Sequence, residues 1–400
     1  MADEWLTNGR EDVVRVAINA QLLSFDTSAR NSGISRFTYK LLDGLGRITT
    51  DLEFTAFINK AEQKDAAKSD VGQAGRIRLL AGNVITSGPL RRVAWEQFTL
   101  PRELKNLGAD VFHAPMNVIP RSVPCASVVT IHDIAFIRYP EYFRPTRRYY
   151  QRILTRHSAR SATLIVTVSE HTKRDLVDFF QINPDKIRVI YPSIAPDFRR
   201  AAPEVIARFR AKKGLPERYL LYLGNLEPRK NLETLVTAYE RLRSHMGAET
   251  PPLILAGAKG WYYEPLFRQV RELGLERDVT FVGFVSGEEQ PLWYAGAAAF
   301  VYPSIYEGFG APVVEALGCG TPTITSNTSS MPEAAGTLAT LVAPQDADSL
   351  ATAMYHTLCD DAVRARTRAE GPDWARRFSL EHMAQRYTDV YREAVALAKS

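Results

Sequence analysis

Short runs of β-branched and aromatic residues alternate with amphipathic segments along most of the chain. A strand buried in a parallel sheet reads as a short apolar run, and a helix between two such strands reads as a pattern with a period near 3.6. The alternation therefore predicts parallel α/β units. Six runs lie in the first half: VRVAINA, LEFTAFI, ADVFHAP, SVVTIHD, TLIVTVS and IRVIYP. Six more lie in the second half: YLLYLGN, PLILAGA, DVTFVGF, AAFVYPS, TPTITSN and ATLVAP.

The segment between these two series predicts a domain boundary. It reads SIAPDFRRAAPE, and Pro196 and Pro203 interrupt regular structure within it. We therefore expect a first doubly wound, Rossmann-like domain over residues 13–195 and a second over residues 216–376. Residues 377–400 form one amphipathic helical pattern with no strand after it, and we expect this helix to cross back onto the first domain.

Length and composition agree with a globular protein of two domains. The chain has 400 residues, of which 45% are hydrophobic and 24% charged. No run of 18 apolar residues predicts a transmembrane helix. The N-terminal MADEWLTNGREDVV is acidic and polar where a secretory signal is basic and then apolar, so we expect a cytoplasmic protein.

Charge and cysteine content exclude two further classes. A formal net charge of +5 is mild for this length and does not predict a nucleic-acid partner. Cys125, Cys319 and Cys359 are widely spaced and odd in number, so neither a disulfide framework nor a zinc site is predicted.

The first candidate chemistry lies in YEGFGAPVVEALGCGTP, residues 306–322. The preceding strand ends near Ser304, and ligands of parallel sheets bind beyond the carboxyl ends of the strands. Glu307 falls in that crevice, and Pro312 suits the first turn of a helix that carries Glu315. The free N–H groups at the start of that helix would face an anion or the hydroxyls of a sugar.

The stretch EGFGAPVVE resembles the E-x7-E motif of the retaining glycosyltransferases of family 4, which have the two-domain GT-B fold. In that family the first Glu meets the donor sugar and the second binds the ribose of the nucleotide. The resemblance thus implies these roles for Glu307 and Glu315. It also implies donor contacts for Gly308, Phe309, Gly310 and Ala311. The alternative is a structural strand-turn-helix junction with a capping Glu.

A second stretch, YLGNLEPRKNLETLV, resembles the phosphate-binding segment of the same family. The resemblance implies that Arg229 and Lys230 neutralise the donor diphosphate as the glycosidic bond breaks. Many relatives have Arg directly after the glycine of this segment, where this chain has Asn225, so we expect Arg229 and Lys230 to do more of this work. A solvated basic turn before a helix is the alternative.

The resemblance extends into the first half of the chain. ARNSGISRFTYKLL resembles the glycine loop that faces the diphosphate, and only Gly33 matches it cleanly. TIHDIAF places His132 at a strand end, where the family's His hydrogen-bonds the donor sugar near the reacting carbon. In this fold the base lies against backbone groups and apolar walls, which we expect near Phe284 and Val285.

We expect no metal. Asp346-Ala-Asp348 spells DxD, the metal motif of another glycosyltransferase fold, but it precedes a helical pattern where Asp acts as an N-cap. With Arg229, Lys230 and a helix N-terminus for the diphosphate, no divalent ion is required, and the nucleotide diphosphate sugar is a substrate, not a cofactor.

A basic stripe lies in RYPEYFRPTRRYYQRILTRHSARSA. Arginines recur there at every fourth position, which on a helix spans about 120° of one face. They repel one another by a few tenths of a kcal/mol per pair, so an anionic partner is expected. Our hypothesis is that this face meets anionic lipid headgroups at the inner face of the membrane, or the phosphate of a lipid-linked acceptor. Ion pairs elsewhere in the fold are the alternative. The residues of the stripe are Arg148, Arg152, Arg156 and Arg160.

These observations lead to one hypothesis and two rivals. The chain is expected to move a hexose from a nucleotide diphosphate sugar to a saccharide or lipid-linked acceptor, with retention of configuration. The stretches WEQFTLP, DVFHAP, IHDIAF and NLEPRKN resemble enzymes of bacterial surface polysaccharide assembly, many of them mannosyltransferases. GDP-mannose is therefore the first expected donor and UDP-glucose the second. The rivals are a sugar-nucleotide epimerase of the same fold and a non-catalytic relative that binds the donor.

Overall fold

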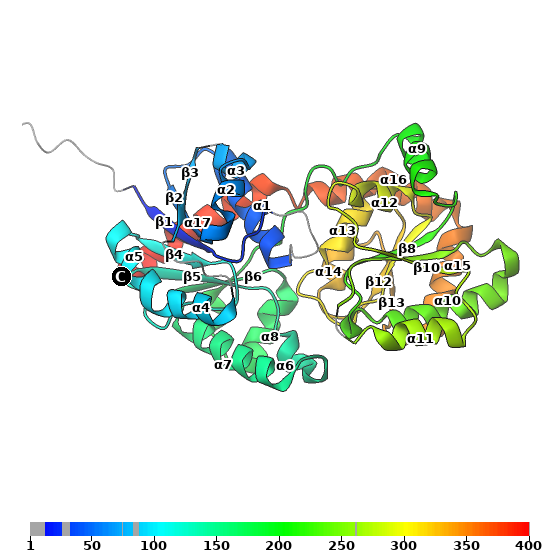
Figure 1. Cartoon of the computed structure of the whole chain (residues 1–400), viewed down its shortest axis with the longest axis horizontal. Helices are drawn as coiled ribbons and strands as arrows, with labels where there is room; N and C mark the ends of the chain where they lie inside the picture. The colour runs from blue at the N-terminus through cyan, green and yellow to red at the C-terminus, as the bar shows by residue number, and fades with distance from the viewer. Residues whose placement is uncertain (1–12, 26–32, 74, 83–87, 261, 400) are drawn as a thin grey trace, which may run out of the picture.

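The structure, a computed structural model, describes residues 13–25, 33–73, 75–82, 88–260 and 262–399. Its two domains each consist of a parallel sheet with helices on both faces, and the last helix returns to the first domain (Figure 1). The expected α/β architecture, with two Rossmann-like domains, is confirmed.

The N-terminal domain contains a seven-stranded parallel sheet of order β3-β2-β1-β4-β5-β6-β7. Most of its central strand residues are apolar and fully buried, as the continuous apolar runs predict. The strands are β1 (Arg15–Ala20), β2 (Glu53–Ile58), β3 (Ile77–Ala81), β4 (Val111–Ala114), β5 (Ala126–Ile131), β6 (Leu164–Thr167) and β7 (Ile187–Val189). The helices are α1 (Gly33–Arg47), α2 (Gln63–Ala66), α3 (Asp70–Gln73), α4 (Pro89–Ala94), α5 (Leu100–Leu107), α6 (Ala135–Arg138), α7 (Pro145–Ser161) and α8 (Glu170–Phe180).

The sequence pattern missed strand β3. It lies at the edge of the sheet and pairs only with β2. Of its five residues only Ile77 is buried, and Arg78 is exposed. An edge strand covered on one side lacks the continuous apolar run by which its neighbours were found.

The C-terminal domain contains a six-stranded parallel sheet of order β10-β9-β8-β11-β12-β13. All six of its strands fall within predicted runs. They are β8 (Leu220–Leu223), β9 (Leu253–Ala256), β10 (Val279–Gly283), β11 (Ala299–Tyr302), β12 (Thr323–Ser326) and β13 (Thr340–Val342). The helices are α9 (Pro203–Lys213), α10 (Leu232–Met246), α11 (Glu264–Glu272), α12 (Gln290–Gly296), α13 (Ala311–Gly318), α14 (Met331–Ala335), α15 (Ala347–Cys359) and α16 (Asp361–Arg376).

Helix α17 (Leu380–Lys399) ties the two domains together. It packs on α1, β4 and β5 of the N-terminal domain, so the predicted crossing is confirmed. Its Tyr391 hydroxyl lies 2.8 Å from Nδ1 of His113, a fully buried residue of β4. Nε2 of the same imidazole lies 2.8 Å from the Thr130 hydroxyl, which in turn lies 2.9 Å from the Tyr387 hydroxyl. Burial lowers the pKa of His113 to about 3, so this network is neutral at neutral pH.

Asp346 is the N-cap of α15, since its carboxylate accepts a hydrogen bond from the Ser349 N–H at 2.9 Å. The structural interpretation of the DxD sequence therefore holds for this residue.

Within the described ranges, no helix is both long enough and apolar enough to span a bilayer.

Candidate functional site

The carboxyl ends of β8 and β11 bring the predicted charged residues together. These strands are neighbours in the sheet, so the segments that follow them meet at one edge. A 3₁₀ turn, Pro228–Lys230, follows β8 and carries Arg229 and Lys230. Glu307 follows β11.

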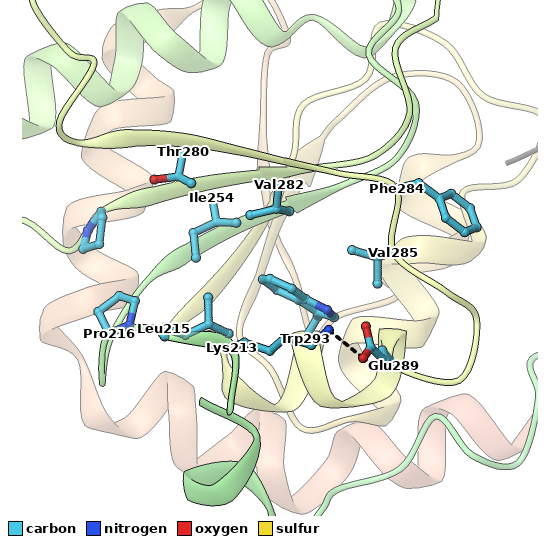
Figure 2. Close-up of a pocket in the computed structure, with 12 residues that line it drawn as sticks. Lys213, Leu215, Pro216, Ile254, Thr280, Val282, Phe284, Val285, Glu289 and Trp293 are labelled. Carbon is cyan, nitrogen blue, oxygen red and sulfur yellow. Dashed lines mark ion pairs between the residues drawn. The ribbon is translucent and has the colours of Figure 1, made fainter. Parts of the chain in front are cut away.

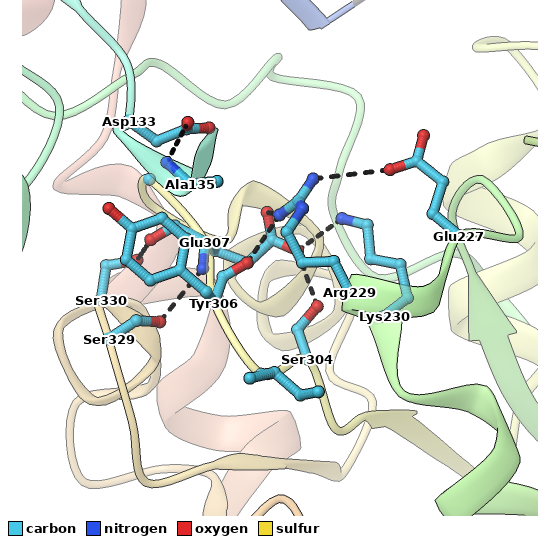
Figure 3. Close-up of polar contacts among 12 residues, drawn as sticks. Asp133, Ala135, Glu227, Arg229, Lys230, Ser304, Tyr306, Glu307, Ser329 and Ser330 are labelled. Carbon is cyan, nitrogen blue, oxygen red and sulfur yellow. Dashed lines mark hydrogen bonds and ion pairs between the residues drawn. The ribbon is translucent and has the colours of Figure 1, made fainter. Parts of the chain in front are cut away.

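Glu307 is the centre of this cluster, as Figure 3 shows. One carboxylate oxygen lies 2.6 Å from a guanidinium nitrogen of Arg229, and the other lies 2.5 Å from the ammonium of Lys230. That second oxygen also accepts hydrogen bonds from the hydroxyls of Tyr302, at 3.1 Å, and Ser304, at 2.7 Å. Glu307 is only 9% exposed, so these partners replace the hydration of its carboxylate.

The charges fix one another's protonation states. Burial alone would raise the pKa of Glu307, but Arg229 and Lys230 lower it to about 2. Burial would lower the pKa of Arg229, yet the carboxylates of Glu307 and Asp133 raise it. Burial lowers the pKa of Lys230, and Glu307 opposes this effect. At neutral pH the cluster thus contains an ionised carboxylate with a cation on either side.

The backbone around the basic turn is held by Asn231. Its φ of 60° is unusual for a residue other than glycine, and asparagine tolerates it better than most. The Asn231 side chain donates to the carbonyl oxygen of Pro303 at 3.1 Å and to that of Pro344. The N–H of Ile305 donates to the Arg229 carbonyl at 3.0 Å. The turn is therefore fastened to the loop that carries Glu307.

Two glycines of the sequence motif serve close packing of the backbone. A Cβ on Gly308 would lie 2.1 Å from the carbonyl oxygen of His132, and a Cβ on Gly310 would lie 2.1 Å from the side chain of Met331. Gly310 also has a φ of 95°, which favours glycine. The Glu307 loop thus touches the N-terminal domain directly at the His132 carbonyl.

The start of α13 leaves its donors open. No acceptor contacts the N–H groups of Gly308, Phe309, Gly310 and Ala311 within the part of the chain that the structure describes. These groups therefore suit an anion or sugar hydroxyls. The Phe309 ring, by contrast, is buried against Tyr191 and Phe378, so only its backbone is open to a ligand.

Glu315 lies one turn inside α13 and is buried. Its carboxylate accepts a hydrogen bond from the Tyr294 hydroxyl at 3.1 Å. Across the cleft, burial lowers the pKa of Lys40 on α1, and Glu315 opposes this effect. Helix α1, which Gly33 begins, therefore carries a lysine whose charge interacts with that of Glu315 in the other domain. The loop before Gly33, including Ser32, lies outside the described residues.

His132 follows β5 and is half-buried. Its Nε2 lies 3.0 Å from the Pro115 carbonyl, which can only accept, so the proton resides on Nε2 and Nδ1 is left as an acceptor. The ring meets Phe37 edge to face, with centroids 4.7 Å apart. Burial lowers the pKa of the imidazole, so it is neutral at neutral pH.

Of the other predicted donor contacts, Asn225 borders this cluster, whereas Phe284 and Val285 lie apart from it. Asn225 donates to Glu227 at 3.4 Å, and Glu227 lies 3.7 Å from Arg229. Val285 is buried, while Phe284 is 47% exposed with its ring directed outward (Figure 2). Both line a cavity of about 300 Å³ that runs along the edge strand β10 and reaches the residues before β8 and β9. That cavity extends away from the carboxyl ends of these strands, so it is not the crevice that contains Glu307.

Sequence reasoning missed the contacts that join the two domains at this site. The Tyr306 hydroxyl donates to Asp175 of α8 at 2.6 Å. The same fully buried carboxylate accepts from Arg138 at 2.6 Å, and His171 lies 3.5 Å away. Only three-dimensional proximity identifies this set, because Tyr306 is 131 residues from Asp175.

A second contact between the domains caps a helix. Glu333 of α14 accepts the N–H groups of Glu170 and His171, each at 2.8 Å. These are the first residues of α8 in the N-terminal domain. A carboxylate at a helix N-terminus satisfies free donors and opposes the positive end of the dipole.

The basic stripe lies on α7. All four of its arginines are exposed, and none has an ion-pair partner among the residues that the structure describes. The described residues therefore do not support the alternative that these arginines form ion pairs elsewhere in the fold. Tyr149, 69% exposed, and Ile153, 46% exposed, lie on the same helix.

Among the described ranges, no group of three or more His, Cys, Asp or Glu side chains is arranged to hold a metal ion.

Two family models match the two halves of the chain. The family model described as Glycosyltransferase Family 4 matches residues 31–198, and the model described as Glycosyl transferases group 1 matches residues 205–374. O-antigen chain mannosyltransferase B of Escherichia coli is 32% identical over 377 residues, which are 90% of this chain and 96% of that protein.

Two solved structures share the fold. Sucrose-phosphate synthase from Thermosynechococcus elongatus superposes with a TM-score of 0.75 at 22% identity, over 96% of this chain and 99% of that one. Anabaena HepE in complex with UDP and glucose has a TM-score of 0.71 at 18% identity, over 95% of this chain and all of that one.

Replacing Glu307 by Gln is expected to lower the free energy of unfolding by about 3 kcal/mol at pH 7, because two buried cations lose their counter-charge. The folded-state pKa lies below the ordinary 4.5, so this stabilisation is complete above pH 4.5 and is lost as the pH falls toward 2. Denaturant unfolding at pH 7 and at pH 3 measures the difference. Glu370→Gln, in an exposed pair with Arg366, serves as the control and is expected to change little. An equal loss at both pH values would contradict the ion cluster.

Glu333→Ala is expected to open the two domains, since α8 loses two charge-assisted hydrogen bonds at its N-terminus. We expect the fraction of molecules in which the two domains meet as in this structure, relative to molecules in which they have separated, to fall by about tenfold or more. Small-angle X-ray scattering of the protein without ligand measures the radius of gyration, which should increase. The matched control is Glu288→Ala, since Glu288 is exposed and has no partner among the described residues. Identical scattering from Glu333→Ala and Glu288→Ala would contradict a role of Glu333 in holding the two domains together.

Proposed function

Since the chain belongs to glycosyltransferase family 4, we propose that it is a retaining hexosyltransferase that uses a nucleotide diphosphate sugar. The observation that carries this proposal is the ionised Glu307 between Arg229 and Lys230, beside the open N–H groups of α13. This arrangement offers cations for a diphosphate and a carboxylate for sugar hydroxyls within one crevice.

In this proposal the donor diphosphate lies against Arg229, Lys230 and the start of α13. As the glycosidic bond breaks, negative charge grows on the leaving phosphate, and positioned cations in a site shielded from water stabilise it. The Glu307 carboxylate holds both cations in place and accepts hydrogen bonds from the donor sugar. No metal ion is needed for charge neutralisation.

In this proposal the phosphate leaves and the acceptor hydroxyl attacks on the same face of the sugar, so the anomeric configuration is retained. The reacting carbon would lie near His132, whose carbonyl oxygen is at the Gly308 contact between the domains. A carbonyl dipole there stabilises the positive charge that develops on the sugar. The leaving phosphate accepts the proton of the acceptor hydroxyl, so no separate general base is required.

The donor and acceptor are proposed from the relatives. Mannose from GDP-mannose is the first proposal, because a relative covering 90% of this chain is an O-antigen chain mannosyltransferase. Glucose from UDP-glucose is the second. Glu315 would bind the ribose, and the loop with Phe284 and Val285 would border the base. The acceptor is a saccharide or a lipid-linked saccharide of polysaccharide or glycolipid synthesis. The stripe on α7 would hold the enzyme at the cytoplasmic membrane surface.

Calorimetric titration with GDP-mannose, UDP-glucose, GDP and UDP tests the donor. We expect one nucleotide family to bind selectively, and this binding to survive a chelator because cations of the chain neutralise the diphosphate. Turnover of the bound donor with a saccharide acceptor, followed by NMR of the product, is expected to show the anomeric configuration of the donor. Conversion of the donor without an acceptor would indicate an epimerase. Absence of turnover with any acceptor would favour a non-catalytic binder.

Reversing two charges of the stripe, Arg148→Glu with Arg152→Glu, is expected to weaken binding to vesicles of phosphatidylglycerol by at least about tenfold, since each basic residue near an anionic surface contributes about 1 kcal/mol. Co-sedimentation measures this. The matched control reverses Arg268 and Arg271 on α11, which are also exposed. If both double variants bind like the unchanged protein, the stripe has no role at the membrane.

A further inference from the structure

A cavity of about 720 Å³ has walls from both domains and is not used by the site described above. The N-terminal domain contributes the turn between α6 and α7, and the C-terminal domain contributes the loop between β9 and α11. Helices α6 and α11 lie at the lower edges of the two domains in Figure 1. The lining residues are Tyr142, Phe143, Arg144, Gly260, Tyr262, Tyr263 and Glu264.

Both walls of this cavity continue into the Glu307 cluster. On one side the Tyr142 ring stacks on Tyr139 with centroids 6.0 Å apart, and Tyr139 meets Tyr306 at 5.6 Å. Tyr306 directly precedes Glu307, and its carbonyl accepts a hydrogen bond from Arg229 at 2.6 Å. The cavity and the ion cluster are therefore joined by a continuous row of three rings.

The opposite wall reaches the same cluster through Gly260. A Cβ on Gly260 would lie 2.6 Å from Cγ of Glu227, so the two loops touch. Glu227 in turn lies 3.7 Å from Arg229. Both walls of the cavity therefore contact residues that lie against the ion cluster.

One of the two tyrosines in the C-terminal wall has an unusual backbone conformation. Tyr262 has a φ of 56°, a conformation that costs a residue other than glycine about 1 kcal/mol or more, and its side chain is 60% exposed. The neighbouring Tyr263 ring is braced by Phe267, at 5.6 Å, and by the ammonium of Lys259, at 5.0 Å. The fold thus holds aromatic surface at the cavity instead of burying it.

The chemistry of the lining fits a sugar ring. The faces of aromatic rings are partially negative and attract polarised C–H groups, and a pocket with aromatic walls and a few polar groups is typical of a ligand site. Arg144 and Glu264 are exposed at the rim, without an ion-pair partner among the described residues, and offer donors and acceptors to hydroxyls. An alkyl chain would use neither of these charged groups.

We propose that this cavity binds a sugar unit of the saccharide acceptor, adjacent to the unit that carries the reacting hydroxyl. The proposal rests on the transferase function, because it takes the Glu307 cluster as the place of reaction. The rings of Tyr139 and Tyr306 separate the cavity from Glu307, so a single sugar at the reacting position does not fill it. Acceptors of two or three units therefore gain contacts that a monosaccharide lacks.

Transfer to octyl mannosides and octyl glucosides of one, two and three units tests this subsite. In the unchanged protein the KM for the longer acceptors is about tenfold below that for the monosaccharide, as expected for one aromatic contact. Tyr262→Ala removes this advantage, while kcat and the Kd of the donor stay the same. Tyr262→Phe keeps the ring and the advantage. Leu273→Ala, an exposed apolar residue of the same domain outside the cavity, serves as the control.

Failure of the subsite and failure of the transferase function give different results. If Tyr262→Ala binds donor normally and retains the length advantage, the subsite is refuted and the transferase function stands. If the unchanged protein transfers to none of these glycosides, saturation-transfer NMR with the same glycosides, which needs no donor, decides the subsite. Saccharide binding that Tyr262→Ala abolishes supports it, and absence of binding, or binding that Tyr262→Ala leaves unchanged, overturns it. If the unchanged protein binds none of the nucleotide sugars, the transferase function is contradicted, and the subsite is still decided by the saccharide binding measured by NMR.

Discussion

A carboxylate buried between two cations is the interaction on which the rest of the site depends. Glu307 can stay ionised at 9% exposure only because Arg229 and Lys230 replace the water it has lost. In return, the carboxylate holds two cations in the same crevice without a bound anion. A diphosphate that enters would therefore meet cations already in position, which lowers the cost of ordering them at the moment of binding.

The Glu307 loop and α14 also join the two domains. Gly308 meets the His132 carbonyl, Tyr306 donates to the buried Asp175, and Glu333 caps α8. In all three contacts, a residue of the C-terminal domain that neighbours or follows Glu307 in the sequence meets the N-terminal domain. The partners in the N-terminal domain lie at or beyond the carboxyl ends of its strands. In the proposed function, closure of the two domains would assemble the groups that face donor and acceptor, and α17 would keep the domains connected during opening.

The strands of both cores and the charged residues after β8 and β11 were predictable, because buried parallel strands read as apolar runs and ligands bind beyond their carboxyl ends. The edge strand β3 was not, since only Ile77 is buried in it. The packing of the Phe309 ring against Tyr191 and Phe378, which leaves only its backbone open to a donor, was not predictable from the motif. The pairs Tyr306 with Asp175 and Glu333 with Glu170 join residues more than a hundred positions apart, and no local pattern reports such contacts.

The most direct test of the account compares the affinities of GDP and GMP, or of UDP and UMP if uridine nucleotides are preferred, for Arg229→Met and the unchanged protein by calorimetry. In the proposed function, only a diphosphate would place a second phosphate against Arg229 and Lys230. The account predicts that Arg229→Met weakens diphosphate binding by about tenfold or more, as expected for a lost charge-assisted hydrogen bond, and leaves monophosphate binding nearly unchanged. Equal effects on both nucleotides, or none on either, would contradict it.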